Sequence, residues 1–371
     1  MLLLIPGPVT THDAVRAAAA QDYAPWDNSF RDLVVRVRQR VLHVAGGRDG
    51  EHTVLPLQGC GHFALEAAIR TFLPPGGRML LPMTGQYADR IARLAAEAGR
   101  VAVSLPVSLT RSVDPAAVEA ALAADASISH LTVVHSETAT GVVHDAPALA
   151  AVAGRLGRRV IVDSVSAFGA LPFNIGTLPM VDSVSFTTNK CLEGVPGGSF
   201  TIARVDRLLA CAGQAGSWSF DFSDIYTHGL RAGWGSHRFT PAASAIAAFD
   251  VALDLFDAEG GQPARLARYT ANMQVLYDGV RALGLAPCLR REDQGPIVLN
   301  VDAPSGAAWN LQAFVDGLKA RGVLISNFHN TKTPSFRVGC IGAVTPEDMR
   351  RAIDAMGAVL GEMSIRRRTA A

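Results

Sequence analysis

The stretch Ser183-Val-Ser-Phe-Thr-Thr-Asn-Lys-Cys-Leu-Glu-Gly-Val-Pro-Gly-Gly198 carries Lys190 between an apolar strand and a turn rich in glycine and proline. Lysine is rarely buried, because its ammonium group is costly to remove from water unless it is paired or reacts chemically. Cationic or apolar surroundings lower the pKa of such a lysine, and the neutral amine forms imines with aldehydes. The position of Lys190 therefore predicts a reactive amine at the end of a buried strand.

Short apolar runs alternate with alanine-rich stretches from about residue 50 to residue 205. They predict strands at 53–57, 79–82, 131–134 and 160–162, and helices at 63–72, 88–98 and 146–156. This rhythm is typical of an α/β fold in which crossover helices join parallel strands. Chemistry in such sheets gathers in the loops at the carboxyl ends of the strands.

Asp163 follows strand 160–162 directly, so a carboxylate reaches the same edge of the sheet as Lys190. On its own, Asp163 could equally be a helix N-cap or part of a loop turn. Pyridoxal phosphate needs both groups: a lysine amine at its aldehyde carbon, and a carboxylate at the pyridine nitrogen that keeps the ring an electron sink. We therefore expect Lys190 and Asp163 to be the catalytic residues of a pyridoxal-phosphate enzyme.

The segment Gln58-Gly-Cys-Gly-His62 lies between a strand and a helix and offers free backbone N–H groups to a phosphate. Its glycine spacing also matches a dinucleotide fingerprint. That alternative is disfavoured because the next strand, 79–81, is not followed by the acidic residue that a ribose requires. Cys60 and His62 lack further ligands nearby, so we expect no metal site.

Three further residues fit the same site. Tyr87 follows a strand and could stack on a pyridine ring, or be an ordinary half-buried tyrosine. In His135-Ser-Glu-Thr-Ala-Thr-Gly141 a hydroxyl could reach the ring oxygen, while Glu137 is either part of the site or a loop-bracing carboxylate. Arg337, inside an apolar strand, could grip a substrate carboxylate through two hydrogen bonds or form an interdomain salt bridge.

The composition favours a soluble enzyme acting on small molecules. The 371 residues are 49% hydrophobic and 18% charged, with a formal net charge of +1. The near-neutral balance predicts neither a nucleic-acid nor a membrane partner. Five scattered cysteines form no C-x-x-C pair, which favours a reducing cytoplasm over a disulfide framework. The apolar start, residues 1–5, lacks a basic region and is too short for a signal peptide.

The length predicts more than one domain. We expect an N-terminal arm at 1–20, a large cofactor-binding domain at 21–255 and a small α+β domain at 256–371. The polar, aromatic stretch at 212–236 has the composition of a loop and is too long for a bare connector, so we expect a function or an interface there.

These motifs together resemble the class V aminotransferase family, over nearly the whole chain. The similar segments are Ile5-Pro-Gly-Pro-Val-Thr-Thr11, Gly59 to Ala68, His135 to Gly141, Asp163-Ser-Val-Ser-Ala-Phe-Gly169, Asn189-Lys-Cys-Leu-Glu-Gly-Val-Pro-Gly197, Arg238-Phe-Thr-Pro241 and Phe336-Arg-Val-Gly339. The resemblance implies the pyridoxal-phosphate fold type I, with a large, mainly parallel sheet domain and a smaller C-terminal α+β domain.

The resemblance also implies roles for individual residues. Cys60, Gly61 and His62 would bind the cofactor phosphate, Tyr87 would stack on the ring and Thr138 would reach its O3′ oxygen. Val165 would cover the opposite ring face, and Asn189 would flank Lys190. His237 and Thr240 would touch the phosphate of a partner subunit, which implies a homodimer with shared sites. Arg337 would hold the substrate's acid group.

For the reaction, the resemblance implies ping-pong transfer of the amino group of 2-aminoethylphosphonate to pyruvate. The Asn-Lys-Cys and Gly-Val-Pro-Gly words are typical of members with that activity, whereas Gly61-His62 is similar to alanine–glyoxylate enzymes. A transaminase of the alanine– or serine–glyoxylate type, and a lyase on the same fold, therefore remain alternatives.

Overall fold

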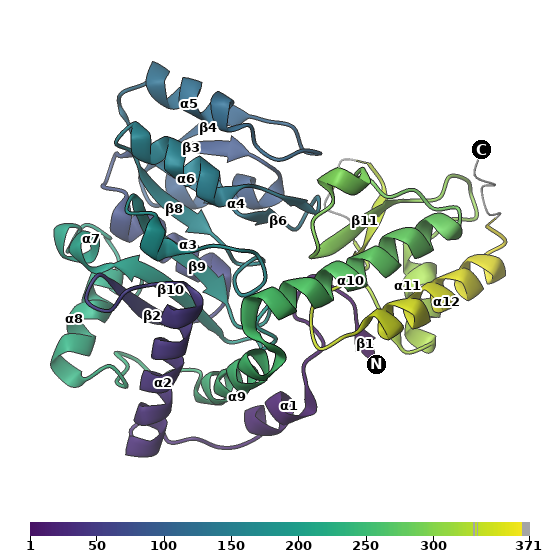
Figure 1. Ribbon diagram of the computed structural model, residues 1–371, viewed down its shortest axis with the longest axis horizontal. Helices are drawn as coiled ribbons and strands as arrows, with labels where there is room; N and C mark the ends of the chain where they lie inside the picture. The colour runs from purple at the N-terminus through teal and green to yellow at the C-terminus, as the bar shows by residue number, and fades with distance from the viewer. Residues whose placement is uncertain (329–330, 332, 366–371) are drawn as a thin grey trace.

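A seven-stranded sheet runs through the larger part of the computed structural model, which describes residues 1–328, 331 and 333–365 (Figure 1). Its strand order is β2-β10-β9-β8-β5-β3-β4. Every neighbouring pair is parallel except the two that involve β10. The strand bounds are β2 (His52–Gln58), β3 (Arg78–Met83), β4 (Val101–Pro106), β5 (Ile128–Val134), β8 (Arg159–Asp163), β9 (Val181–Thr187) and β10 (Gly198–Arg204). The α/β class and the mainly parallel sheet are confirmed.

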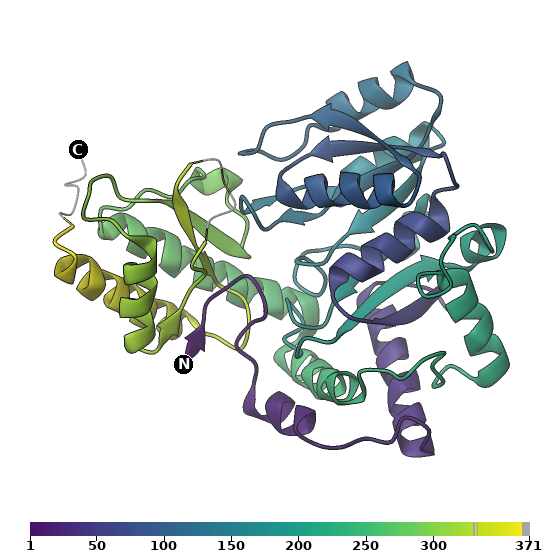
Figure 2. The same ribbon diagram turned by 180° about the vertical axis from the view of Figure 1, so that it is seen from behind.

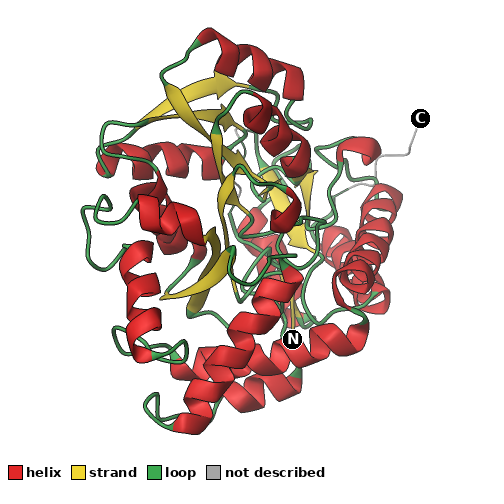
Figure 3. Ribbon diagram, turned by 60° about the vertical axis from the view of Figure 1, so that its left-hand side comes forward, coloured by secondary structure: helices red, strands yellow, loops and turns green. Residues whose placement is uncertain are grey.

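Helices cover both faces of this sheet, as Figure 3 shows. Successive side chains of a strand point to opposite faces, so Val160 and Val162 of β8 pack into one core cluster and Ile161 into another. The first cluster includes side chains of α2 (Asn28–Val44), α5 (Pro115–Ala124), α6 (Ala146–Arg155) and α9 (Ala243–Glu259). The opposite face packs against α3 (Gly61–Phe72), α4 (Gln86–Glu97), α7 (Val205–Ala210) and α8 (Phe222–Ala232).

The smaller part has a hydrophobic core of its own, around Phe314, Phe336 and Met356. The long helix α10 (Gly261–Ala282) leads into this part from α9, and the first strand of the chain also lies in it (Figure 2). Its other elements are β1 (Leu2–Leu3), paired with β12 (Val323–Leu324), β11 (Val298–Asp302), paired with β13 (Ser335–Gly339), and the helices α11 (Leu311–Ala320) and α12 (Pro346–Glu362).

The short elements lie mostly in connections. They are α1 (Asp13–Ala19), the two-residue strands β6 (Ser136–Glu137) and β7 (Val142–Val143), and two 3₁₀ turns at Ile175–Thr177 and Arg291–Asp293. In the described part of the chain, every helix is too short or too polar to cross a lipid bilayer.

The loop predicted at 212–236 is wrong for residues 222–232, which form helix α8, and the residues on either side of the helix are turns and loop. The Asp221 side chain caps this helix by accepting hydrogen bonds from the backbone of Ser223 and Asp224. The prediction also missed β10, β4 and α5. Strand β4 lies at the edge of the sheet and is only partly buried, so its apolar signal is weak.

Candidate active site

Neighbouring strands deliver Asp163 and Lys190 to one edge of the sheet. Asp163, the last residue of β8, pairs with Val134 at the end of β5 and with Ser185 of β9. Strand β9 ends at Thr187, and Lys190 follows in the next turn. The carboxylate and the amine therefore meet where the carboxyl ends of parallel strands gather, as the sequence predicted.

Asp163 is a buried acid, 4% exposed. Its Oδ1 accepts a hydrogen bond of 2.9 Å from the backbone N–H of Val165. Burial raises the pKa of Asp163 to about 6, while that hydrogen bond and the charge of Lys190 act in the opposite direction. Among the described residues, no cation lies within ion-pair distance of this carboxylate. Asp163 can therefore serve a cationic group of a bound molecule.

Lys190 has the properties of a reactive amine. Its Nζ donates a hydrogen bond of 2.7 Å to the carbonyl oxygen of Pro6. Burial, together with the positive charges of Arg337 and Arg90, lowers the pKa of Lys190 to about 8, against the opposing charges of Cys191 and Asp163. A useful fraction of the amine is therefore neutral at physiological pH.

The N-terminal arm closes over this lysine. Gly7 has a φ of +137°, and a Cβ at this position would lie 2.4 Å from the Nζ of Lys190. Only glycine fits so close to the amine in this backbone conformation. No site role was predicted for the arm, although its Pro6-Gly7-Pro8 motif was a usable signal.

The start of α3 forms a cradle for an anion. The helix begins at Gly61, and the residue before it, Cys60, makes no side-chain cap hydrogen bond. A Cβ on Gly61 would lie 2.5 Å from a methyl group of Val165, so the helix start and the loop after Asp163 touch. The pKa of His62 is lowered, mainly by burial and then by the charge of Arg90. Cys60, Gly61, His62 and Val165 are thus brought to the Asp163 edge, with the helix dipole available for a phosphate.

Tyr87 and Arg90 lie near the start of α4. Tyr87 is half-buried, and the guanidinium carbon of Arg90 lies 5.0 Å from the centre of its ring. Through its charge Arg90 also lowers the pKa values of Lys190 and Arg337. Arg90 was not predicted to be a site residue, because it is an exposed helix residue that belongs to no recognisable motif.

The loop after β5 joins the site to the smaller part of the molecule. Thr138 is buried, and its carbonyl oxygen accepts a 3.1 Å hydrogen bond from Nη1 of Arg337, a residue of β13. Asn300 of β11 donates to the carbonyl oxygen of Ala139 at 2.6 Å. Arg337 is only 2% exposed. The guanidinium predicted to bind an acid group is therefore anchored beside the Lys190 edge.

Glu137 is a second buried acid of this loop, 0% exposed. Its Oε1 accepts from the backbone N–H of Ala139 at 3.0 Å, and its Oε2 lies 3.4 Å from the hydroxyl of Thr84. Burial raises the pKa of Glu137 to about 7. These contacts hold the loop against the start of α4, as the loop-bracing alternative expected.

Asn189 directly precedes the lysine. Its Oδ1 accepts a hydrogen bond of 2.9 Å from the hydroxyl of Thr187 at the end of β9. The contact ties the lysine turn to its strand, so Asn189 can flank a molecule bound to Lys190.

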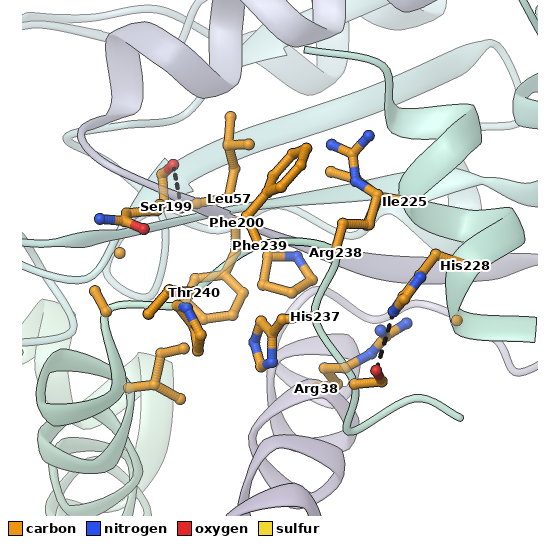
Figure 4. A pocket seen from close by; sticks show the side chains of 18 of the residues that line it. Arg38, Leu57, Ser199, Phe200, Ile225, His228, His237, Arg238, Phe239 and Thr240 are labelled. Atoms are coloured by element: carbon orange, nitrogen blue, oxygen red, sulfur yellow. Dashed lines mark hydrogen bonds between the residues drawn. The ribbon is translucent and has the colours of Figure 1, made fainter. Parts of the chain in front are cut away.

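His237 and Thr240 line a pocket whose lining includes neither Asp163 nor Lys190. Arg38, Phe200 and His228 also line this pocket, and Figure 4 shows these side chains around it. Both ring nitrogens of His237 are buried and find no hydrogen-bond partner among the described residues. Burial, with the charges of Arg38 and His228, lowers the pKa of His237 to about 4. The predicted contact of these residues with a partner's cofactor stays a prediction.

The donor set at the Lys190 edge matches a phosphorylated aromatic aldehyde. It combines a primary amine, a carboxylate without an ion-pair partner in the described chain, a helix start without a side-chain cap and an aromatic ring. Over the same part of the chain, no three His, Cys, Asp or Glu side chains gather in a way that could hold a metal ion. The residues present therefore fit pyridoxal 5′-phosphate.

Comparison with known sequences places the chain among aminotransferases. The model of the family "Aminotransferase class-V" matches residues 15–344. A 2-aminoethylphosphonate–pyruvate transaminase of Burkholderia ambifaria is 41% identical over 364 residues, covering 98% of this chain and 96% of the relative. One of Pseudomonas putida is 38% identical and covers 98% of both chains.

Solved structures show the same fold. An aspartate aminotransferase from Thermus thermophilus has a TM-score of 0.85 and 25% identity, covering 98% of this chain and 100% of its own. A pyridoxamine-pyruvate aminotransferase from Mesorhizobium loti has a TM-score of 0.88 and 24% identity, covering 99% of this chain and 93% of its own. The fold is type I of the pyridoxal-phosphate enzymes, and the cofactor is pyridoxal 5′-phosphate. The chain belongs to the class V aminotransferase family.

Proposed function

We propose that this enzyme moves the amino group of 2-aminoethylphosphonate to pyruvate, giving phosphonoacetaldehyde and L-alanine. The observation that supports the choice of donor most directly is the similarity, at about 40% identity over nearly the full length, to proteins named for that reaction. The reaction is a ping-pong exchange: the donor's amino group stays on the enzyme while the aldehyde leaves, and pyruvate then takes it up as alanine.

Pyridoxal phosphate supplies the carbonyl carbon that carries the amino group between the two halves, and a ring that withdraws electrons. Lys190 holds it and, when its amine is free, moves a proton at the carbon that bears the substrate's amino group. With a pKa of about 8, this amine accepts and returns protons near neutral pH. Asp163, whose pKa is about 6, is ionised at that pH and stabilises a protonated pyridine nitrogen.

The other residues bind and orient. The backbone N–H groups of Gly61 and His62 would bind the cofactor's phosphate, with Cys60 completing the turn. Tyr87 would stack on one face of the ring, and Val165 would cover the other. Thr138 lies within the loop that reaches the ring oxygen, and Asn189 flanks the amine. The N-terminal arm, through Pro6 and Gly7, helps to exclude water from Lys190.

Two arginines suit a phosphonate at the acid end of the donor. Arg337 is buried and anchored on Thr138, and Arg90 lies close enough for its charge to lower the pKa of Arg337. A phosphonate carries up to two negative charges, so it can interact favourably with both cations at once. This pair therefore favours a phosphonate over the single charge of a carboxylate.

The pocket of His237 and Thr240 supports our proposal of a homodimer with shared sites. Among the described residues, this pocket is lined by Arg38 and by no acidic side chain, and the two ring nitrogens of His237 find no hydrogen-bond partner there, so an anion from a second copy would fit it. The pocket also includes Gln58, which directly precedes the phosphate-binding turn. We place the enzyme in the cytoplasm, where its five free cysteines would stay reduced.

A half-reaction tests the donor. The cofactor-loaded enzyme is mixed without acceptor with 2-aminoethylphosphonate, L-alanine or L-serine, and the loss of yellow colour is followed. We expect the phosphonate to bleach the enzyme fastest and pyruvate to restore the colour. Faster bleaching by alanine or serine, with restoration by glyoxylate, would instead establish the glyoxylate-type activity that the Gly61-His62 pair resembles. Ammonia released without any acceptor would reveal a lyase.

A further inference from the structure

Glu193 lies three residues after Lys190 and has a strained backbone. Its φ is +59°, and Ser364 is the only other non-glycine residue of the described chain with a positive φ. The N–H of Glu193 donates to the carbonyl oxygen of Lys190 at 2.9 Å, and the N–H of Gly194 donates to that of Thr188 at 2.8 Å. The conformation of Glu193 is therefore part of the turn that presents the amine. Strain of this kind persists only where surrounding contacts enforce it.

Helix α10 supplies those contacts. The Oε1 of Glu193 accepts hydrogen bonds from Oη of Tyr269 at 2.6 Å and from Nη2 of Arg268 at 2.7 Å. Arg265 donates to the carbonyl oxygen of Cys191 and lies 3.5 Å from the same Glu193 oxygen. Glu193 is only 8% exposed, so these interactions are poorly screened by water. One face of α10 thus holds the turn directly after the lysine.

The same helix residues hold the loop that follows the strand of Arg337. Nη1 of Arg268 donates to the carbonyl oxygens of Gly342 at 2.6 Å and Val344 at 2.9 Å. The N–H of Gly342 donates to Oη of Tyr269 at 3.2 Å. Arg268 and Tyr269 therefore form hydrogen bonds both with the lysine turn of the larger part and with the loop after β13 of the smaller part.

We infer that Glu193 is a positioning residue that acts through its hydrogen bonds to Arg268 and Tyr269; we call these three residues the clamp. The clamp fixes the distance between the amine of Lys190 and the guanidinium of Arg337, and the enzyme therefore selects donors by their length. The inference rests on the proposed function, because a donor must place its amino group at one end of this span and its acid group at the other. None of the three residues of the clamp needs to touch the donor. A donor whose carbon chain is one methylene longer or shorter then fits only if the residues of the clamp move.

The test compares Glu193→Gln and Tyr269→Phe with the matched control Asp250→Asn. Asp250 is a buried carboxylate paired with Arg36 and Arg40 between α2 and α9, and within the described chain its side chain forms no hydrogen bond or ion pair with the lysine turn. The holoenzymes are assayed with aminomethyl-, 2-aminoethyl- and 3-aminopropylphosphonate, and kcat/KM is measured for each donor. The pH midpoint of the cofactor's visible absorption is recorded without any donor.

We expect the wild-type enzyme to prefer the 2-aminoethyl donor over its neighbours by about 10- to 200-fold, the usual value of one methylene in a fitted site. Glu193→Gln should lower this preference at least about fivefold and move the pH midpoint by about half a unit, because a negative charge beside the lysine turn is lost. Tyr269→Phe should lower the preference by a smaller factor. Asp250→Asn should change neither quantity, even if it lowers Tm.

An unchanged donor preference and pH midpoint in Glu193→Gln and Tyr269→Phe would overturn the inference and reduce the clamp to a structural role. Failure of the proposed function looks different, since the wild-type enzyme would then use none of the three phosphonates. In that case a shifted pH midpoint in Glu193→Gln, with none in Asp250→Asn, still supports control of Lys190 by the clamp, and no shift contradicts it.

Discussion

Two buried carboxylates on neighbouring strands are held in opposite ways. Asp182, near the start of β9, is 0% exposed, and its Oδ1 accepts hydrogen bonds from Arg159 at 2.7 Å and from Arg207 at 3.1 Å. Asp163, at the end of β8, is almost as deeply buried, yet within the described chain it pairs with no cation and bonds to the backbone of Val165. One end of the sheet neutralises its charge internally, and the other end leaves a charge for a ligand.

The two carboxylates therefore serve different purposes on one sheet: Asp182 stabilises the fold, and Asp163 is available to the cofactor. A buried acid with two arginines stabilises the fold, whereas a buried acid without a counter-ion costs free energy until a cationic ring nitrogen arrives. Loss of either carboxylate should therefore affect a different measurement.

The largest effect is expected for Asp182→Asn. Removing the charge leaves Arg159 and Arg207 without their shared partner, so the free energy of unfolding should fall by about 3–5 kcal/mol. Chemical denaturation measures the loss. The kcat of the folded variant should stay near the wild-type value. A large fall in kcat without loss of stability would contradict the proposed difference between Asp182 and Asp163.

Asp163→Asn should give the reverse pattern. An amide cannot stabilise a protonated pyridine nitrogen, so kcat/KM should fall by about 10²- to 10³-fold, the usual loss for one electrostatic contact in a preorganised site. Steady-state kinetics on the cofactor-saturated variant provide the measurement. Activity within twofold of the wild type would show that this carboxylate does not serve the ring.

The same substitution should stabilise the protein when the cofactor is removed. Because burial raises the pKa of Asp163 from 3.8 to about 6, the folded state bears the cost of ionisation once the pH rises above about 6. Both states are protonated well below pH 3.8, so no difference remains there. At pH 8, Asp163→Asn should raise the free energy of unfolding of the cofactor-free protein by up to about 3 kcal/mol.

Unfolding curves at pH 8 and at pH 4 provide that comparison. Equal effects of Asp163→Asn at the two pH values would contradict the account, since the gain comes from ionisation alone. With cofactor added at pH 8, the stabilising effect should shrink, because the ring nitrogen then supplies the missing charge in the wild-type enzyme.

The smallest effect is expected at the acid-binding end, for Arg337→Lys. Lysine keeps the charge but loses the planar pair of donors, so KM for the phosphonate donor should rise about tenfold with little change in kcat. The KM for pyruvate, measured in the same assays, shows whether the acceptor's carboxylate uses the same arginine. An unchanged KM for both substrates would remove Arg337 from the site.

Local sequence patterns predicted the elements that carry the chemistry. Strand β8 follows from the apolar run at 160–162, which leads directly to Asp163, and strand β9 follows from the run at 183–186, which precedes the turn that carries Lys190. Helix α3 was predicted because its apolar residues repeat with helical spacing and glycines precede them.

Contacts between distant segments could not be predicted in this way. The bond from Lys190 to Pro6 joins residues 184 positions apart, and Glu193 meets Tyr269 across 76 positions. No periodicity links such partners, because they meet only when the arm, the lysine turn and α10 pack together. Helix α8 was missed because its polar, aromatic composition resembles a loop, although Asp221 provided a capping signal.

The central claim is that Lys190 is the amine that holds the cofactor. The sequence contains three lysines, Lys190, Lys319 and Lys332, so one labelling experiment separates them. The protein is saturated with pyridoxal phosphate, reduced with borohydride to fix the cofactor covalently to the amine that holds it, digested and analysed by peptide mass spectrometry. The account predicts the added mass on the peptide that contains Lys190 and on no other; a label on Lys319 or Lys332, or none at all, would contradict it.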